Sequence, residues 1–246
     1  MKQIASAFAA VMLSAGMASA APLNQGFESG LDSWLTIGTV VATPSTSVTT
    51  FDSTLWTINA FETQMAQLNP SASVASIETA LGITAGALNT LNINPSGGSL
   101  TDASAIYQTF AGTAGETVTQ FFNYVATDYI PFNDPAYAVI VNQDTADVEV
   151  INVLASIQGL GIAVGTSGNT GWNQFSYTLP ANANYLLAFV TTNDKDTILD
   201  SVLFLDNNAG TCIPDCPPLV STPEPASLSL LALGTVALLG LRRRRR

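Results

Sequence analysis

The sequence predicts a mainly β protein in which one domain, over residues 21–206, folds as a β-sandwich of the jelly-roll type. Short runs rich in Thr, Val and aromatic residues recur along the chain, and Gly, Pro, Asn or Asp bounds each run. Such a rhythm of short strands and turns is typical of sandwiches and jelly rolls. The predicted strands cover residues 34–41, 105–110, 116–126, 137–142, 148–157, 172–179, 185–192 and 198–205.

The segment 70–91 departs from this rhythm and predicts a short helical insertion. Pro70 follows Asn69, as in a helix that begins with an Asn cap and a proline in its first turn. Gly82 ends this first helix, and Thr84 caps a second one. The apolar residues of the first helix recur at helical spacing, at Val74, Ile77 and Leu81. We expect the insertion to pack on an edge or rim of the sandwich.

The chain begins with the features of a secretory signal over residues 1–20. Lys2 supplies a positive charge, an apolar run covers residues 4–17, and residues 18–20 give the small-residue pattern that signal peptidase accepts. The run is too short to span a membrane permanently. We therefore expect a signal helix that signal peptidase removes, so that the mature chain begins at Ala21.

The part of the chain between its two end segments is strongly acidic. The chain has 18 Asp and Glu residues against 7 Lys and Arg, and Lys195 is the only basic residue outside those segments. Because this charge repels phosphate, we expect no nucleic-acid binding. The sequence contains no histidine, which excludes Ser-His and Cys-His catalytic pairs and histidine metal sites.

Cys212 and Cys216 lie in a segment rich in Asn, Gly and Pro, which predicts a linker over residues 207–222. Two cysteines are too few for a four-ligand zinc site. In the oxidising compartment that the signal implies, we expect a local disulfide between them rather than a redox motif.

The last segment, residues 223–246, combines three features in a fixed order. Pro223, Glu224 and Pro225 precede an apolar run over residues 228–241, and five arginines, residues 242–246, end the chain. As a helix, the run covers roughly 21 Å, whereas a permanent span needs about 20 residues. We expect a transient anchor in the inner membrane, with the arginines on the cytoplasmic side.

This order of features resembles the PEP-CTERM sorting signal of Gram-negative bacteria. The resemblance implies that an exosortase recognises the motif formed by Pro223, Glu224 and Pro225. It also implies processing of the chain for the cell surface or for an extracellular matrix such as that of a biofilm.

The two ends of the predicted domain resemble galactose-binding-like, carbohydrate-binding jelly rolls. Residues 23–34 match the opening pattern N-x-x-F-E-x-G…W, and residues 200–207 are similar to the closing strand, without its usual apolar residue after the second position. In those modules a structural Ca²⁺ joins the two ends. The resemblance implies Glu28 and Asp206 as ligands, with Asn24 as a further oxygen donor. Alternatively, Glu28 ends a strand and Asp206 caps a turn.

Two other acidic clusters could hold a cation, but such Asx-rich loops are more often solvated turns. One cluster comprises residues 193–196 with Asp200, and the other comprises Asp128 with residues 132–134. We predict turns at both.

The aromatic residues suggest a stacking platform for sugar rings, formed by Trp34, Trp56, Trp172, Tyr129 and Tyr137. Trp34 and Trp172 each begin a predicted strand, so we expect both of them in the core. Trp56 lies in a polar stretch and is the one tryptophan left open as a ligand-binding residue.

Three classes of function follow from these observations. The first is a structural or adhesive protein of the surface or matrix, which we prefer, and the second is a carbohydrate-binding module that acts on exopolysaccharide. The third is a glycan-active enzyme, which needs two well-placed carboxylates. Because nothing in the sequence marks such a pair, we expect no enzymatic activity.

Overall fold

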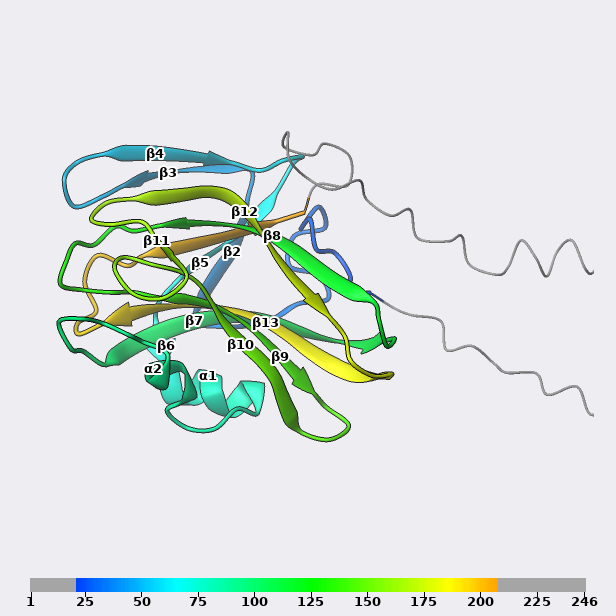
Figure 1. Cartoon of the computed structure of the whole chain (residues 1–246). Helices are drawn as coiled ribbons and strands as arrows, with labels where there is room; N and C mark the ends of the chain where they lie inside the picture. The colour runs from blue at the N-terminus through cyan, green and yellow to red at the C-terminus, as the bar shows by residue number, and fades with distance from the viewer. Residues whose placement is uncertain (1–20, 208–246) are drawn as a thin grey trace, which may run out of the picture. The chain divides into compact units, whose positions relative to one another are not determined.

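The computed structural model describes residues 21–207, which form two sheets packed face to face (Figure 1). The seven-stranded sheet has the order β1 (Leu35–Ile37), β7 (Leu100–Gly112), β13 (Ala183–Asp194), β9 (Ala136–Asn142), β10 (Asp147–Ser156) and β11 (Ile162–Ala163), with β6 (Ala72–Ser73) also paired to β7. The five-stranded sheet has the order β12 (Asn169–Thr178), β8 (Thr117–Val125), β14 (Val202–Asp206), β5 (Met65–Asn69) and β2 (Thr39–Thr43). The pairs are antiparallel except β10 with β11. The predicted mainly β sandwich is confirmed.

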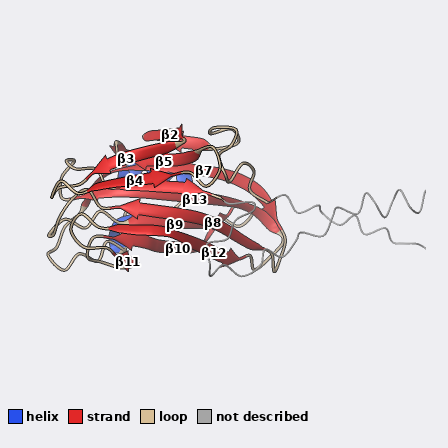
Figure 2. Cartoon of the chain, turned by 90° about the horizontal axis from the view of Figure 1, so that it is seen from above, coloured by secondary structure: helices blue, strands red, loops and turns tan. Residues whose placement is uncertain are grey.

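A hairpin and two helices add a layer on each outer face of the sandwich. The hairpin of β3 (Ser45–Thr49) and β4 (Leu55–Asn59) covers the five-stranded sheet, and helices α1 (Val74–Leu81) and α2 (Ala87–Thr90) cover the seven-stranded sheet. The strands of the hairpin and of both sheets lie roughly along one common axis (Figure 2). The molecule therefore has four layers.

Three apolar clusters fill the three spaces between these layers. Between the sheets lie residues such as Trp34, Phe122, Phe189 and Leu203, and this cluster holds the largest number of buried aromatic rings. Each sheet contributes to two clusters, because neighbouring residues of a strand point to opposite faces of the sheet. The cluster under the hairpin comprises Val48, Ile58, Met65, Val125, Val202 and Phe204.

The predicted helical insertion exists but begins later than expected. Asn69 is the last residue of β5, and the side chain of Ser73 caps α1 by accepting from the backbone N–H of Ser76 at 3.2 Å. Pro70 is therefore not a helical residue. Gly82 ends α1 in the left-handed conformation, as predicted. The second helix is capped by Gly86 rather than by Thr84.

The predicted strand 34–41 is divided between the two sheets. Gly38 adopts a φ of 79° between β1 and β2, and a Cβ at this position would lie 2.1 Å from Ser104 Oγ. Only glycine allows this crossing. The other predicted strands exist with shifted bounds; the last one begins at Val202, because residues 195–201 form a loop. β3, β4 and β5 were not predicted.

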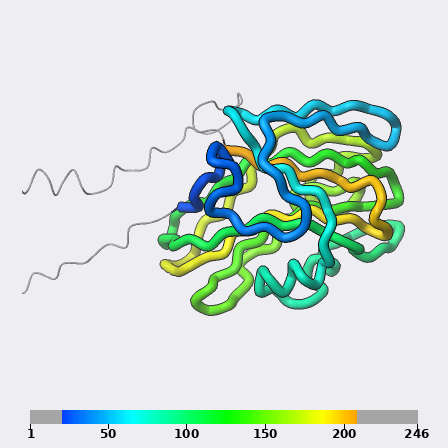
Figure 3. Tube along the Cα trace, turned by 180° about the vertical axis from the view of Figure 1, so that it is seen from behind, coloured from blue at the N-terminus to red at the C-terminus, as the bar shows by residue number. Residues whose placement is uncertain are grey.

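The first and last described residues lie at the same end of the sandwich (Figure 3). Gln120 links the opening segment to the last strand, because its Nε2 donates to the carbonyl oxygens of Gln25 at 3.1 Å and of Asp206 at 2.6 Å. The opposite end, which we call the loop end, comprises the β3–β4 turn and the loops 126–135, 157–168 and 195–201 (Figure 1). Within residues 21–207, no helix is long and apolar enough to cross a membrane.

Candidate functional site

The β3–β4 hairpin creates a cleft against the edge of the five-stranded sheet. The cleft has a volume of about 320 Å³ and lies beside β4, over the start of β12 and the middle of β8. We call it the tryptophan cleft, because Trp56 of β4 and Trp172 of β12 line it. The remaining lining residues are Thr57, Ile58, Asn59, Asn123, Asn169 and Gly171.

The two tryptophans are held in different ways. The Trp56 indole Nε1 donates to the carbonyl oxygen of Ser167 at 2.9 Å, which fixes the ring against the loop end. The Trp172 ring packs against Phe61, with ring centroids 4.7 Å apart and a tilt of 38° between the planes. Both side chains are only partly buried, so their rings reach the cleft.

Asn123 presents a buried amide to the same cleft. Its side chain is 3% exposed, and its Oδ1 has no hydrogen-bond partner among the described residues. Asn123 lies on β8 opposite Trp172 of β12, so the amide and the indole belong to neighbouring positions on one face of the sheet. A buried amide oxygen without a donor is costly, and a ligand with hydroxyl groups would supply that donor.

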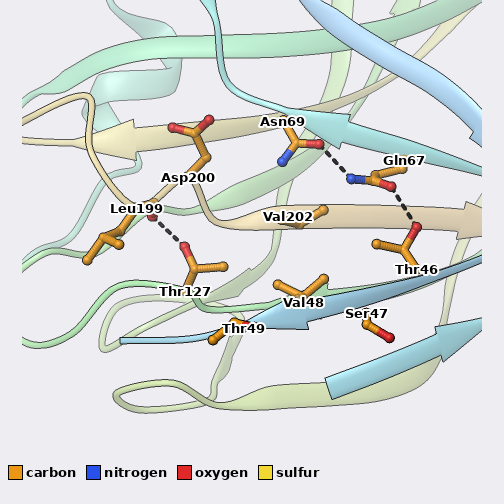
Figure 4. A pocket seen from close by; sticks show the side chains of 10 residues that line it. All are labelled: Thr46, Ser47, Val48, Thr49, Gln67, Asn69, Thr127, Leu199, Asp200 and Val202. Carbon is orange, nitrogen blue, oxygen red and sulfur yellow. Dashed lines mark hydrogen bonds between the residues drawn. The ribbon is translucent and has the colours of Figure 1, made fainter. Parts of the chain in front are cut away.

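A second cleft lies on the other side of the hairpin (Figure 4). It also measures about 320 Å³, and Val48, Leu199 and Val202 form its apolar part. Thr46 Oγ1 donates to Gln67 Oε1 at 2.9 Å, and Gln67 Nε2 donates to Asn69 Oδ1 at 2.8 Å. These polar groups satisfy one another, and no aromatic ring lines this cleft. We call it the hydroxyl cleft.

The structure separates the aromatic residues that the sequence grouped together. Trp34 lies in the core between the sheets, as predicted, whereas Trp172 lies on the outer face of its sheet and not in the core. Tyr137 is fully buried and donates its hydroxyl to the Leu88 carbonyl oxygen at 3.1 Å. Tyr129 stacks on Phe51 at the loop end, with centroids 4.0 Å apart. Only Trp56 and Trp172 of the predicted platform share a cleft.

The two-residue alternation of a strand is enough to place Trp172 on the outer face of its sheet. Phe175 of the same strand is buried in the core, and residues three positions apart in a strand point to opposite faces. Asn123 had no comparable signal, because a polar residue inside an aromatic run does not reveal which face it occupies.

Two of the three residues implied as calcium ligands lie close together at the end where the described chain begins and ends. Glu28 accepts hydrogen bonds from the backbone N–H groups of Thr63 and Gln64, at 3.1 and 3.2 Å, and from the Thr63 hydroxyl. Asp206 accepts from the backbone N–H of Phe61 at 2.6 Å. A Cβ at Gly26 would lie 3.9 Å from both the Glu28 Cγ and Asp206 Oδ1.

The surroundings of Asp206 disfavour its charged form. Burial raises the pKa of Asp206 to about 6, the hydrogen bonds from Phe61 and Asn207 oppose this rise, and the charges of Glu28 and Glu62 add to it. The carboxylate oxygens of Glu28 and Asp206 fit the hard-ligand preference of Ca²⁺. The Asn24 amide is held within its own loop, where Nδ2 donates to the carbonyl oxygens of Gly30 and Asp32.

The acidic residues of the loop end form a buried polar network. Asp194 Oδ1 accepts from Asn92 Nδ2 at 2.9 Å, and Asp134 Oδ1 accepts from the backbone N–H of Asp194 at 2.8 Å. Ser201 Oγ donates to Asp134 Oδ2 at 2.9 Å. Burial raises the pKa of Asp134 well above its usual range. The carboxyls of Asp134 and Asp194 therefore accept hydrogen bonds inside the protein. The predicted solvated turns are wrong at these two residues, because Asp194 is the last residue of β13 and both side chains are buried.

Several expected features lie outside the described residues. They are the signal segment 1–20, the linker cysteines Cys212 and Cys216, the motif residues Pro223, Glu224 and Pro225, and the apolar run 228–241. Within residues 21–207, no three Asp, Glu or Cys side chains gather into a group that could hold a metal ion.

The site and the fold together define a β-sandwich protein with an aromatic-lined, uncharged cleft. Residues 221–246 match the PEP-CTERM protein-sorting motif. The chain thus carries a sorting motif that implies an exported, exosortase-processed protein. No curated protein matches the chain.

Solved structures that resemble the fold include carbohydrate-binding modules. TmCBM61 in complex with beta-1,4-galactotriose is 13% identical with a TM-score of 0.41, and the match covers 76% of this chain and 95% of that one. The Family 16 Carbohydrate Binding Module-2 is 14% identical with a TM-score of 0.35, covering 76% and 95%. The K3 cleaved adhesin domain of Lys-gingipain from Porphyromonas gingivalis is 18% identical with a TM-score of 0.38, covering 76% and 96%.

Proposed function

We propose that the protein binds a neutral glycan in the tryptophan cleft. The observation that carries this proposal is the meeting of two tryptophan rings with a buried amide whose Oδ1 has no partner within the described residues. Sugars present apolar C–H faces and polar hydroxyl edges, so a site that binds them needs both kinds of group.

The aromatic part of the cleft supplies the apolar contacts. Trp56 and Trp172 are partly exposed within it, and aromatic faces pack well against C–H groups. The hydrogen bond from Trp56 to Ser167 and the packing of Trp172 on Phe61 hold both rings in place before a ligand arrives. Such preorganisation lowers the entropic cost of binding.

The amide part of the cleft supplies the polar contacts and the preference for an uncharged ligand. Asn59, Asn123 and Asn169 can each donate and accept hydrogen bonds. None of the described residues that line the cleft carries a charge, and the rest of the described chain is acidic. A glycan rich in uronic acids would meet repulsion. The lining also lacks a carboxylate pair for glycoside hydrolysis, so we propose binding without catalysis.

A glycan array with matched variants tests the proposal. We expect the wild-type protein to bind neutral oligosaccharides and to ignore uronic-acid oligomers of equal length. Trp172→Ala should lower the affinity at least tenfold, a loss of about 1.4 kcal/mol. Leu55→Ala serves as the control, because Leu55 lies next to Trp56 on β4 but is 60% exposed and outside the cleft lining. Equal affinities of Trp172→Ala and wild type would exclude the cleft.

We further propose that this binding serves a structural or adhesive role at the cell surface or in the extracellular matrix of a Gram-negative bacterium. The sorting motif at residues 221–246 supports export. Signal peptidase would cleave before Ala21, the tail would anchor the chain transiently in the inner membrane, and exosortase would then process it. The bound glycan would be exopolysaccharide of that matrix.

Intact-mass analysis of the protein from the host surface and medium tests this route. We expect a mass that lacks residues 1–20 and the arginines 242–246. A surface protein that retains the arginines would show that the tail is not removed.

We also propose that Glu28 and Asp206 hold a structural Ca²⁺. Their closeness and the pKa of Asp206, which burial and then the charge of Glu28 raise, support it, because a cation would offset the cost of a buried charged carboxylate. Bound there, Ca²⁺ would join the opening segment to the last strand. A chelator should lower the unfolding temperature of the wild type and should have a smaller effect on Glu28→Gln. An unfolding temperature that does not respond to chelator would refute the site.

A further inference from the structure

We propose that the hydroxyl cleft is a second ligand site, which holds one sugar ring of a neutral glycan by hydrogen bonds and aliphatic contacts. The cleft lies between β3 of the hairpin, the strand β5 and the start of β14 (Figure 4). Its volume of about 320 Å³ is at the small end of the range of small-molecule pockets. It shares no lining residue with the tryptophan cleft, so the two clefts are separate sites.

A chain of hydrogen bonds along the cleft leaves one amide donor without an acceptor. Thr46 Oγ1 donates to Gln67 Oε1, and Gln67 Nε2 donates to Asn69 Oδ1 at 2.8 Å, which sets the orientation of the Asn69 amide. Within the described residues, Asn69 Nδ2 makes no hydrogen bond. Figure 4 shows this nitrogen on the side of the amide that faces Asp200. Because Asn69 is only partly buried, a ligand in the cleft can accept from it.

Asp200 supplies an acceptor that complements this donor. Its Oδ1 accepts from Asn193 Nδ2 at 2.9 Å, and no hydrogen bond from residues 21–207 reaches its Oδ2. The side chain is partly buried and lines the cleft. A hydrogen bond to an ionised carboxylate is stronger than one between neutral groups. Together, Asn69 and Asp200 match two neighbouring hydroxyl groups of a sugar ring, one of which accepts while the other donates.

The aliphatic part of the cleft offers contacts for the face of the ring. Val48 and Val202 are almost fully buried, whereas Leu199 is 39% exposed, and all three line the cleft. A sugar ring carries C–H groups on its faces and hydroxyl groups around its edge. It can therefore bury C–H surface on the aliphatic side chains, which is favourable, while its edge meets the amide and the carboxylate.

The same groups disfavour charged ligands. Asp200 is the only charged residue among the described residues that line the cleft, so the site repels carboxylates and phosphates. An ammonium group or a metal ion could pair with Asp200, but neither can accept a hydrogen bond from Asn69 Nδ2. A hydroxyl group both donates and accepts, so a neutral sugar satisfies both residues.

Without an aromatic ring, the hydroxyl cleft should bind sugar more weakly than the tryptophan cleft. We expect a Kd on the order of 10 mM for a single sugar ring, because few hydrogen bonds form and association itself is costly. Binding this weak would not retard the protein in a gel whose sugar concentration lies well below that Kd. With both clefts occupied, one molecule would hold two glycan chains; this consequence, unlike the hydroxyl cleft itself, rests on the proposed function of the tryptophan cleft.

Chemical-shift titration of the full-length, isotope-labelled Trp172→Ala protein tests the site, because this background lacks one wall of the tryptophan cleft. The probes are the methyl glycosides of glucose, galactose and mannose. We expect at least one of them to shift the Asn69 side-chain amide resonance, with saturation at a Kd on the order of 10 mM. Tetrahydropyran-2-methanol, a similar ring with a single hydroxyl group, should not. The absence of a saturable shift at Asn69 with all of the glycosides would overturn the proposal, whatever the tryptophan cleft binds.

Matched variants in the same background assign the binding to the cleft, with the Kd measured from backbone resonances of β3. Asp200→Asn keeps an oxygen for Asn193 but replaces the free acceptor by a donor, and Asn69→Asp keeps the oxygen that accepts from Gln67 but removes the donor. Each should raise the Kd about tenfold or more. Asp196→Asn removes a charge from the same loop outside the cleft lining and should leave the Kd unchanged. Equal Kd values for the Asp200→Asn and Asp196→Asn proteins would overturn the proposal.

Discussion

Asn123 shows how a single residue can be costly for the fold and still useful. Its buried Oδ1 has no hydrogen-bond partner within residues 21–207, so the amide loses its hydration without a return inside the protein. Such buried polar atoms without a partner are few in native folds. The position opposite Trp172 places the amide beside the ring that lines the proposed glycan site.

At this scale we predict that Asn123→Ala weakens glycan binding without lowering stability. The substitution removes an uncompensated polar group, so the free energy of unfolding should stay within about 1 kcal/mol of the wild type. The lost hydrogen bonds to the glycan should lower the affinity about tenfold. Denaturant unfolding and calorimetric titration measure the two effects, and a loss of stability above 2 kcal/mol would contradict the account.

The β3–β4 hairpin is the element on which the candidate site depends. It was not predicted, because its Ser- and Thr-rich first strand carries few apolar residues. Its second strand does alternate, since Trp56 and Ile58 face the sheet while Leu55 and Asn59 are exposed. Read together with the turn residues Asp52 and Ser53, this alternation is a hairpin signal. The register on the sheet, however, depends on contacts with Val125 and Phe204, which lie far away in sequence.

At the scale of elements we predict that Ile58→Ala and Ile77→Ala have similar stability costs but different effects on binding. Both isoleucines are almost fully buried, Ile58 under the hairpin and Ile77 under α1. Each substitution should cost about 2–5 kcal/mol. Only Ile58→Ala loosens a wall of the cleft, so only this variant should bind glycan more weakly at a temperature where both proteins are folded. Equal affinities would show that the hairpin does not shape the site.

At the scale of the whole molecule, acidic residues dominate, and several of them are buried. Burial raises the pKa of Asp206 and of Asp128 to about 6. The titratable groups that act on Asp206 are Glu28 and Glu62, and Asp196 acts on Asp128. In the unfolded chain these carboxyls lose their protons near pH 4. Between about pH 4 and pH 6 the folded state therefore holds more protons than the unfolded state.

This proton difference predicts that the calcium-free protein loses stability as pH rises from about 4.5 to 7. Thermal unfolding in EDTA should give a temperature several degrees higher at pH 5 than at pH 7, and saturating Ca²⁺ should reduce the difference. An unfolding temperature that rises steadily from pH 4.5 to 7 in EDTA would show that these carboxyls do not govern the pH response.

The sequence predicts more of the architecture than of the candidate site. Strand rhythm, the helical insertion and the core position of Trp34 all follow from local patterns, and the structure bears them out. The division of residues 34–41 at Gly38 depends on the close approach of Ser104, and the cleft depends on pairing between β8 and β12. Such contacts join residues that are distant in sequence, so local patterns do not specify them.

The most direct test of glycan binding in the tryptophan cleft is affinity electrophoresis in gels that contain a neutral exopolysaccharide from the host. The wild-type protein and Leu55→Ala should be retarded equally, and Trp172→Ala should migrate as in a gel without polysaccharide. If Trp172→Ala is retarded as strongly as the wild type while remaining folded, the tryptophan cleft is not the glycan-binding site.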